Sequence, residues 1–172
     1  MTPAGLITDA FGRIRETVID TLYGLTTEQL TYRVDVDANP IAWLIWHLTR
    51  IQDDHVAAAF GAQQVWSEGG WAARFGLPPD STDTGYGHNR VQVAAVSEAC
   101  AASALLADYH EAVYEQTVKL VSGITDEDLD RVVDTSWRPP VTLAVRMVSV
   151  LNDDAQHAGQ AAFVRGIVQR AS

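Results

Sequence analysis

The chain has 172 residues, 47% of them hydrophobic, and a formal net charge of −10. This length is enough for a sizeable core and short for two independent domains, so we expect a single domain over residues 1–172. The acidic excess argues against nucleic acid as a partner, because phosphate binding depends on clustered lysines and arginines. No apolar run reaches the length of a membrane span, and no signal-like segment precedes Asp9, so we expect a cytoplasmic protein with no membrane partner. Cys100 is the only cysteine, which excludes an intrachain disulfide.

Apolar periodicity predicts the first two helices. Over residues 3–23 the hydrophobic side chains recur every three or four positions, which is typical of an amphipathic helix. The second helix is expected to begin at Asn39 and Pro40, because asparagine can cap a helix and proline fits the first helical position. It is expected to end near Phe60, just before a glycine.

A long connection separates the second helix from the third. Residues 61–90 are rich in glycine and contain two adjacent prolines, so they predict a surface excursion with at most a short helix at residues 71–75. Connections this long are often functional, and we expect a lid or a pocket wall. A third helix is predicted over residues 91–121 and a fourth over residues 140–170. The apolar residues expected along the fourth helix are Val141, Val145, Val148, Leu151 and Phe163. The fold class predicted is an all-α four-helix bundle with its long connection between helices 2 and 3.

Two short connectors have similar sequences. Residues 24–30 (GLTTEQL) are matched by residues 123–129 (GITDEDL), and each leads to a proline that opens a long helix. Two copies are too few for a solenoid. The match instead indicates two helix–connector–helix halves, in which the second and fourth helices hold equivalent places.

Three polar residues fall on otherwise apolar helix stripes. His47 shares a stripe with Trp43 on the second helix, and Asp153 and His157 lie four residues apart on the fourth. A buried carboxylate needs a cation, a strong hydrogen-bond donor or water, and the i, i+4 spacing lets Asp153 and His157 bind one ion with His47 joining from a facing helix. Donor atoms should then lie roughly 3 to 4 Å apart when metal is bound, with open positions for water or substrate. From spacing alone, a hydrogen-bonded core histidine and a solvated aspartate remain as alternatives.

The segments NPIAWLIWHL (residues 39–48) and NDDAQHAGQ (residues 152–160) resemble the DinB-like superfamily. More narrowly, they resemble the branch that contains mycothiol-dependent maleylpyruvate isomerase and the mycothiol and bacillithiol S-transferases. The resemblance extends over nearly the whole chain. It implies a divalent metal, commonly zinc or nickel, held by His47, Asp153 and His157. The sequence departs from the commonest pattern at Asp153, where many relatives have histidine and others glutamate.

Several other polar residues are weaker candidates. Asp54 could orient a metal ligand, but a solvated helix carboxylate is the expectation. His55 is expected to be structural or solvated, and His88 to be a mobile surface histidine. Cys100 lies among alanines with no base nearby in the sequence, so we expect a small buried hydrophobe rather than a nucleophile.

Packing is the default role of the aromatic residues. Among the tryptophans, Trp66 and Trp71 in the long connection are the two expected to touch a ligand. Tyr109 and His110 share the third helix, where packing accounts for the tyrosine.

The leading functional hypothesis is an S-transferase that joins a low-molecular-weight thiol, mycothiol or bacillithiol, to a small electrophile. A divalent cation lowers the pKa of a coordinated thiol, so the sulfur is held as the reactive thiolate. The expected partners are a small-molecule substrate and, at most, a second copy of the chain in a homodimer.

Three alternatives stay open at this point. The ion could activate water in a hydrolase, with Asp54 or Asp154 as the general base. The protein could be a non-catalytic stress-response bundle whose metal only stabilises the fold. A di-iron bundle is more distant, because it needs Glu-x-x-His on two helices and this sequence offers one Asp-x-x-His, at Asp154 and His157.

Overall fold

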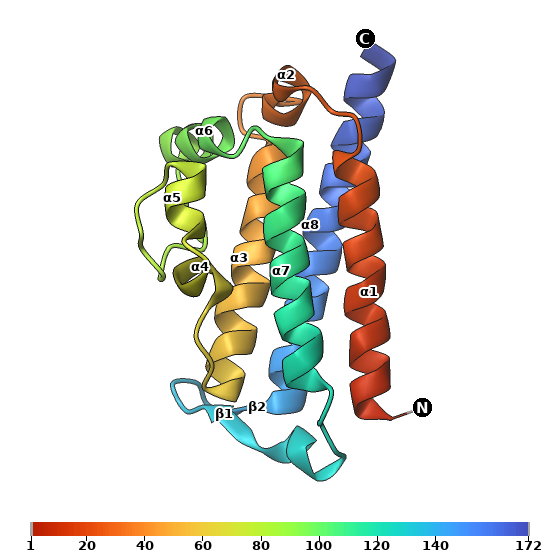
Figure 1. Cartoon of the computed structure of the whole chain (residues 1–172), viewed down its shortest axis with the longest axis vertical. Coiled ribbons are helices and arrows are strands. Elements are labelled where there is room, and N and C mark those ends of the chain that lie inside the picture. Colours follow the sequence, from red (N-terminus) through yellow and green to blue (C-terminus); the bar gives the residue numbers. More distant parts are fainter. Residues whose placement is uncertain (1, 172) are drawn as a thin grey trace.

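Four long helices form a bundle in the computed structural model, which describes residues 2–171; the first and last of them run in one direction and the other two in the opposite direction (Figure 1). They are α1 (Pro3–Leu22), α3 (Ile41–Phe60), α7 (Ser103–Val121) and α8 (Leu143–Ala171). Helix α3 packs against α7 and α8, and α1 packs against the same two helices from the other side. The predicted all-α bundle is confirmed.

Helix α1 follows its sequence pattern. The Thr2 side chain accepts a hydrogen bond from the Gly5 amide at 3.1 Å, and Pro3 occupies the first turn, where its missing N–H costs nothing. The buried stripe faces α7 and α8. Its hydrophobic members are Ala4, Ile7, Phe11, Ile14, Val18 and Leu22.

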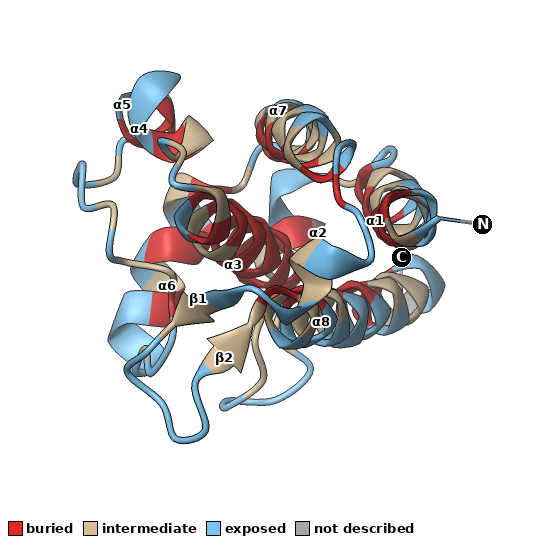
Figure 2. Ribbon diagram, turned by 90° about the horizontal axis from the view of Figure 1, so that it is seen from below, coloured by how far each residue is buried: buried red, intermediate tan, exposed pale blue. Residues whose placement is uncertain are grey.

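Helix α3 is the central element and is buried on nearly every face (Figure 2). It begins one residue after Pro40, whose extended backbone forms the N-cap, and no side chain caps the first turn, so the predicted Asn39 cap is wrong. The helix ends at Gly61 with φ of 64°, a left-handed conformation that glycine adopts without steric cost. Burial on all sides explains why the hydrophobic run at residues 41–48 shows little alternation.

The segment between α3 and α7 is folded rather than loose. It contains α4 (Val65–Glu68), α5 (Trp71–Phe75) and α6 (Arg90–Ala99), so the short helix expected at residues 71–75 is confirmed. The single third helix expected over residues 91–121 is wrong, because α6 and α7 meet at 95° across residues 100–102. Ala102 is extended there, and the turn lets α6 pack across α3. No single helix among the described residues is long and apolar enough to cross a membrane; the α6–α7 pair meets the test only when taken together across its bend.

Short elements lead into the ends of the bundle. Helix α2 (Thr27–Thr31) has a capping box at Thr26, and a 3₁₀ turn, η1 (Glu127–Asp130), occupies the matching connector. Strands β1 (Val132–Asp134) and β2 (Val141–Thr142) then form an antiparallel hairpin, with Val132 opposite Thr142. The fourth helix therefore starts at Leu143 and not at Pro140.

Not all of the apolar residues predicted along α8 are buried. Val145, Val148 and Phe163 are 55%, 66% and 68% exposed. The buried face consists of Leu143, Met147, Val150, Asp154, Ala158, Ala161, Val164 and Val168.

Candidate metal centre

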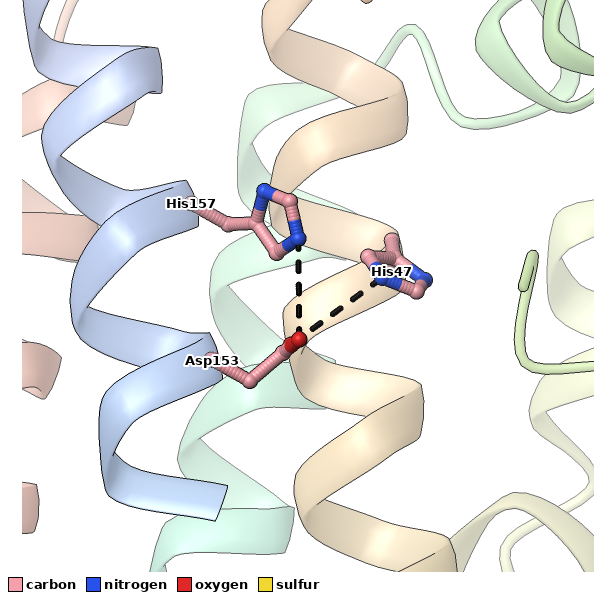
Figure 3. Close-up of side chains that lie close together, drawn as sticks. All are labelled: His47, Asp153 and His157. Atoms are coloured by element: carbon pink, nitrogen blue, oxygen red, sulfur yellow. Dashed lines mark ion pairs between the residues drawn. The ribbon is translucent and has the colours of Figure 1, made fainter. Parts of the chain in front are cut away.

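His47 on α3 and the pair Asp153 and His157 on α8 converge between the two helices (Figure 3). The His47 Nε2 atom lies 4.0 Å from Asp153 Oδ2, and the His157 Nε2 atom lies 3.8 Å from Asp153 Oδ1. One ligand atom from each residue falls within 4.8 Å of the other two. The two imidazole rings meet edge to face with centroids 4.8 Å apart. These separations need to shrink by less than about 1.5 Å to match ligand bonds of about 2.0 to 2.2 Å around one ion.

Hydrogen bonds on the far side of each imidazole select the nitrogen that faces the centre. The His47 Nδ1 atom lies 2.5 Å from the Thr84 carbonyl oxygen, which can only accept, so Nδ1 carries the proton. The His157 Nδ1 atom lies 2.9 Å from the Gln160 side-chain oxygen in the same way. Both Nε2 lone pairs are therefore free to face Asp153, as in metal sites where outer hydrogen bonds fix the tautomer.

The surroundings of His47 and Asp153 suit these side chains to an ion. His47 is 4% exposed, and burial lowers its pKa despite the opposing hydrogen bond with Thr84, which favours the neutral ring. Asp153 Oδ2 is buried and has no hydrogen-bond partner among residues 2–171. An orphaned carboxylate oxygen facing two imidazole lone pairs matches the donor set of a divalent transition metal.

The long connection covers one side of this cluster. Trp43 stacks on His47 with ring centroids 4.5 Å apart, and its indole N–H points at His88 Nδ1 at 3.3 Å. The other nitrogen of His88 lies 2.9 Å from Asp83 Oδ1. The His88 side chain is only 7% exposed, so the expectation of a mobile surface histidine is wrong. Sequence reasoning missed this because Trp43 lies 45 residues away from His88 in the chain.

A second buried polar group, here called the arginine cluster, consists of Arg50, Asp53 and Tyr109. Arg50 Nη1 lies 3.4 Å from Asp53 Oδ2, and the Tyr109 hydroxyl donates to the same oxygen at 2.9 Å. Asp53 also accepts from the backbone amides of Val65 and Trp66, each at 2.8 Å. Burial raises the pKa of Asp53, while these donors oppose the shift. The only sequence signal for this cluster is a pair of opposite charges inside an otherwise apolar helix.

An open cavity of about 790 Å³ adjoins Asp153. Its wall includes Asp54 and His55, whose closest side-chain atoms are 3.4 Å apart, and Asp54 also accepts from Gln64 at 2.7 Å. Arg146 in the same wall donates to Asp134 at 2.7 Å. Asp54 therefore orients no ligand of the cluster, and His55 faces the cavity.

Other predicted residues lie away from the centre. Asp154 is fully buried in the core; burial raises its pKa well above the usual range, and neither oxygen has a partner within the described chain. Cys100 is fully buried, and burial raises its thiol pKa, as expected for a small hydrophobe. Trp66 and Trp71 are buried in packing and do not line the cavity. Trp137, 65% exposed on the hairpin, lines it instead.

Comparisons with known proteins show the family and the fold. The family model described as mycothiol S-transferase matches residues 6–169. Among solved structures, the chain is similar to a conserved protein from Enterococcus faecalis, with 29% sequence identity, a TM-score of 0.85 and 96% of each chain covered. No curated protein matches the sequence. The chain belongs to the mycothiol S-transferase family, and its fold is that family's DinB-like all-α bundle.

Proposed function

We propose that the protein is a divalent-metal-dependent S-transferase that joins a sugar-linked cysteinyl thiol to a small electrophile. The observation that carries the proposal is the convergence of two Nε2 lone pairs and an orphaned carboxylate oxygen beside an open cavity. His47, Asp153 and His157 would hold the ion, which we expect to be zinc or nickel. Three protein ligands leave at least one position for an incoming sulfur atom.

The ion, when bound, lowers the pKa of a coordinated thiol and so supplies a thiolate nucleophile at neutral pH. The residues of the chain define where that sulfur can enter. Trp43 covers His47 on the side of the long connection, whereas Asp153 is 36% exposed and lines the cavity. The thiol therefore approaches from the cavity.

The cavity wall also favours particular thiols. Its volume lies within the usual range for small-molecule sites. The charged side chains in the wall, apart from His55, are Asp54, Asp83, Asp134, Arg146 and Asp153. These carboxylates offer hydrogen-bond acceptors to the hydroxyl groups of a sugar-linked thiol. The exposed ring of Trp137 adds an apolar surface for a sugar or an aromatic electrophile.

The test is conjugation of mycothiol or bacillithiol to a fluorogenic electrophile, monobromobimane, by protein loaded with zinc or nickel. We expect turnover with the metal-loaded protein, loss of turnover after chelation, and loss in a His47→Ala variant whose circular dichroism is unchanged. Glutathione should be a poor substrate. Equal conjugation by fully chelated protein would contradict the proposal, and metal-dependent hydrolysis without a thiol would favour a hydrolase instead.

A further inference from the structure

Residues 81–85 of the long connection lie directly against the metal ligand His47. Thr84 supplies the carbonyl that accepts from His47 Nδ1. Gly85 follows with φ of 88°, where a side chain would be strained. A Cβ atom at Gly85 would lie 2.9 Å from the Trp46 ring, 3.1 Å from His47 Nδ1 and 3.1 Å from the Trp43 ring. The backbone can approach the imidazole this closely only because residue 85 is glycine.

Arg50 fixes the backbone just before that contact. It lies three residues after His47 on α3, and its side chain is fully buried. Its Nε atom donates to the Asp83 carbonyl at 3.1 Å, and Nη2 donates to the Ser81 carbonyl at 2.8 Å. The planar guanidinium thus holds two carbonyls, one on each side of Thr82, in fixed directions.

The same guanidinium is itself held in place. Asp53 supplies the balancing charge, and Arg50 also donates to the Gln64 side chain at 3.0 Å. The Arg50 guanidinium carbon lies 4.9 Å from the centre of the Trp66 ring. Three hydrogen-bond acceptors of Arg50 therefore belong to the long connection: the Ser81 and Asp83 carbonyls and the Gln64 side chain.

We propose that Arg50 is a positioning residue for the metal centre, acting through the backbone of residues 81–85. By fixing the Ser81 and Asp83 carbonyls it holds the Thr84 carbonyl against His47 Nδ1. That contact keeps the proton on Nδ1 and leaves Nε2 open toward Asp153 and His157. The proposal rests on the metal centre described under the proposed function.

The chemical reason is the tautomer of histidine. A neutral imidazole in water prefers its proton on Nε2, which would block the nitrogen that faces the centre. The Thr84 carbonyl reverses this preference in the folded protein before any ion arrives. If the contact is lost, the metal can bind Nε2 only after the proton has moved to Nδ1 and the ring has been reoriented.

Two variants and one matched control test the proposal. Gly85→Ala should displace the Thr84 carbonyl, and Arg50→Lys should keep the charge beside Asp53 but lose the planar fork. Gly87→Ala is the control, because Gly87 also has a positive φ, 76°, but a Cβ there meets nothing within 4 Å. Zinc affinity is measured by competition with a chelator, and the His47 tautomer of the metal-free protein by nitrogen-15 NMR of labelled histidine.

We expect Gly85→Ala and Arg50→Lys to bind zinc about 10- to 100-fold more weakly than the wild type, and Gly87→Ala to bind within twofold of it. His47 should carry its proton on Nδ1 in the wild type and in Gly87→Ala, and shift toward Nε2 in the other two. If Arg50→Lys fails to fold, Gln64→Ala takes its place with the same expectation, because it removes a partner of the guanidinium and a donor to the Ser81 carbonyl.

Three results would overturn the proposal. Equal weakening by Gly85→Ala and Gly87→Ala would show that general strain in the connection is responsible. Unchanged zinc affinity and tautomer in Gly85→Ala and Arg50→Lys would remove the positioning role while leaving the metal centre intact. A wild-type protein that binds no zinc or nickel would overturn the metal centre and this proposal together.

Discussion

Residues 47–53 of helix α3 contribute to two polar clusters. The clusters differ in whether their polar atoms form hydrogen bonds within the protein. In the arginine cluster, Asp53 accepts from two backbone amides and a tyrosine, and Arg50 donates to carbonyls and side-chain oxygens. In the metal cluster, His47 Nε2 and Asp153 Oδ2 face each other at 4.0 Å without a bond. The first cluster is complete as it stands, whereas the second leaves a buried carboxylate oxygen unpaired, which is why we propose an ion there.

Convergence matters in this comparison as much as the missing bonds do. His110 Nε2 and both oxygens of Asp154 are also buried without partners among the described residues. Neither belongs to a group of ligand atoms such as the one formed by His47, Asp153 and His157. A lone unsatisfied atom carries only a desolvation cost, whereas the unsatisfied Asp153 oxygen lies beside the Nε2 atoms of two histidines.

The largest expected effect separates two adjacent aspartates. Asp153→Ala should lose its metal on dialysis, because it removes the only anionic ligand from the cluster. Asp154→Ala should keep it, because that carboxyl lies in the core and its oxygens form no hydrogen bond with the ligands. Metal content per chain after dialysis measures both. Equal loss in the two variants would mean that the register of α8 at the site is wrong.

Breaking the arginine cluster should lower the stability of the fold. Asp53→Ala leaves the fully buried Arg50 without its balancing charge, and we expect a loss of about 3 to 5 kcal/mol in the free energy of unfolding. Asp153→Ala in the metal-free protein should cost far less, because Asp153 has no buried bond to lose. Urea unfolding of both variants tests the contrast. A loss below about 1 kcal/mol for Asp53→Ala would show that the Arg50–Asp53 pair contributes no more than an exposed surface ion pair.

Metal should stabilise the protein without being required for folding. Zinc at about 100 times its dissociation constant adds about 2.7 kcal/mol to the native state, which for a chain of this size raises Tm by roughly 5 to 10 °C. The metal-free protein should still unfold cooperatively, because the core extends over all four long helices. Differential scanning fluorimetry with and without zinc measures the shift. A shift of the same size in Asp153→Ala would place the ion elsewhere.

The smallest effect concerns a buried histidine that is not a ligand. Burial lowers the pKa of His110 to about 4, below its ordinary value of 6.5. Between these values the unfolded chain binds a proton that the folded protein does not, so stability falls as the pH is lowered. From pH 6.5 to 5 the wild type should lose about 1.6 kcal/mol more than His110→Gln. Urea unfolding at both pH values measures this change in each protein. An equal change in the free energy of unfolding for the wild type and His110→Gln would contradict the prediction.

The sequence predicts the long helices well and their connections poorly. Helix α1 has clear apolar periodicity and a capping residue at its start, and helix α3 is a long, largely apolar segment that ends at a glycine. The bend at residues 100–102 has no glycine or proline, so tertiary packing of α6 on α3 decides it. The hairpin strands are too short to show a period of two, and Val145 and Val148 are exposed although they look like core residues.

The predictability of the site follows the same division. His47, Asp153 and His157 could be named because helical spacing and a family resemblance agree on them, and the structure brings them together. Arg50 and Gly85 could not be named, because their partners lie about 30 to 40 residues away in the chain and depend on how residues 61–90 fold. Spacing within one helix is local information, whereas the contacts that orient a ligand are not.

The most direct test of the metal centre is anomalous diffraction at the zinc edge from crystals of zinc-loaded protein. We expect one peak bonded to Nε2 of His47, Nε2 of His157 and a carboxylate oxygen of Asp153, with bonds of about 2.0 to 2.2 Å. The remaining coordination should open toward the cavity beside Asp153. A peak bound to other residues, or no peak at these three side chains in zinc-saturated crystals, would contradict the assignment.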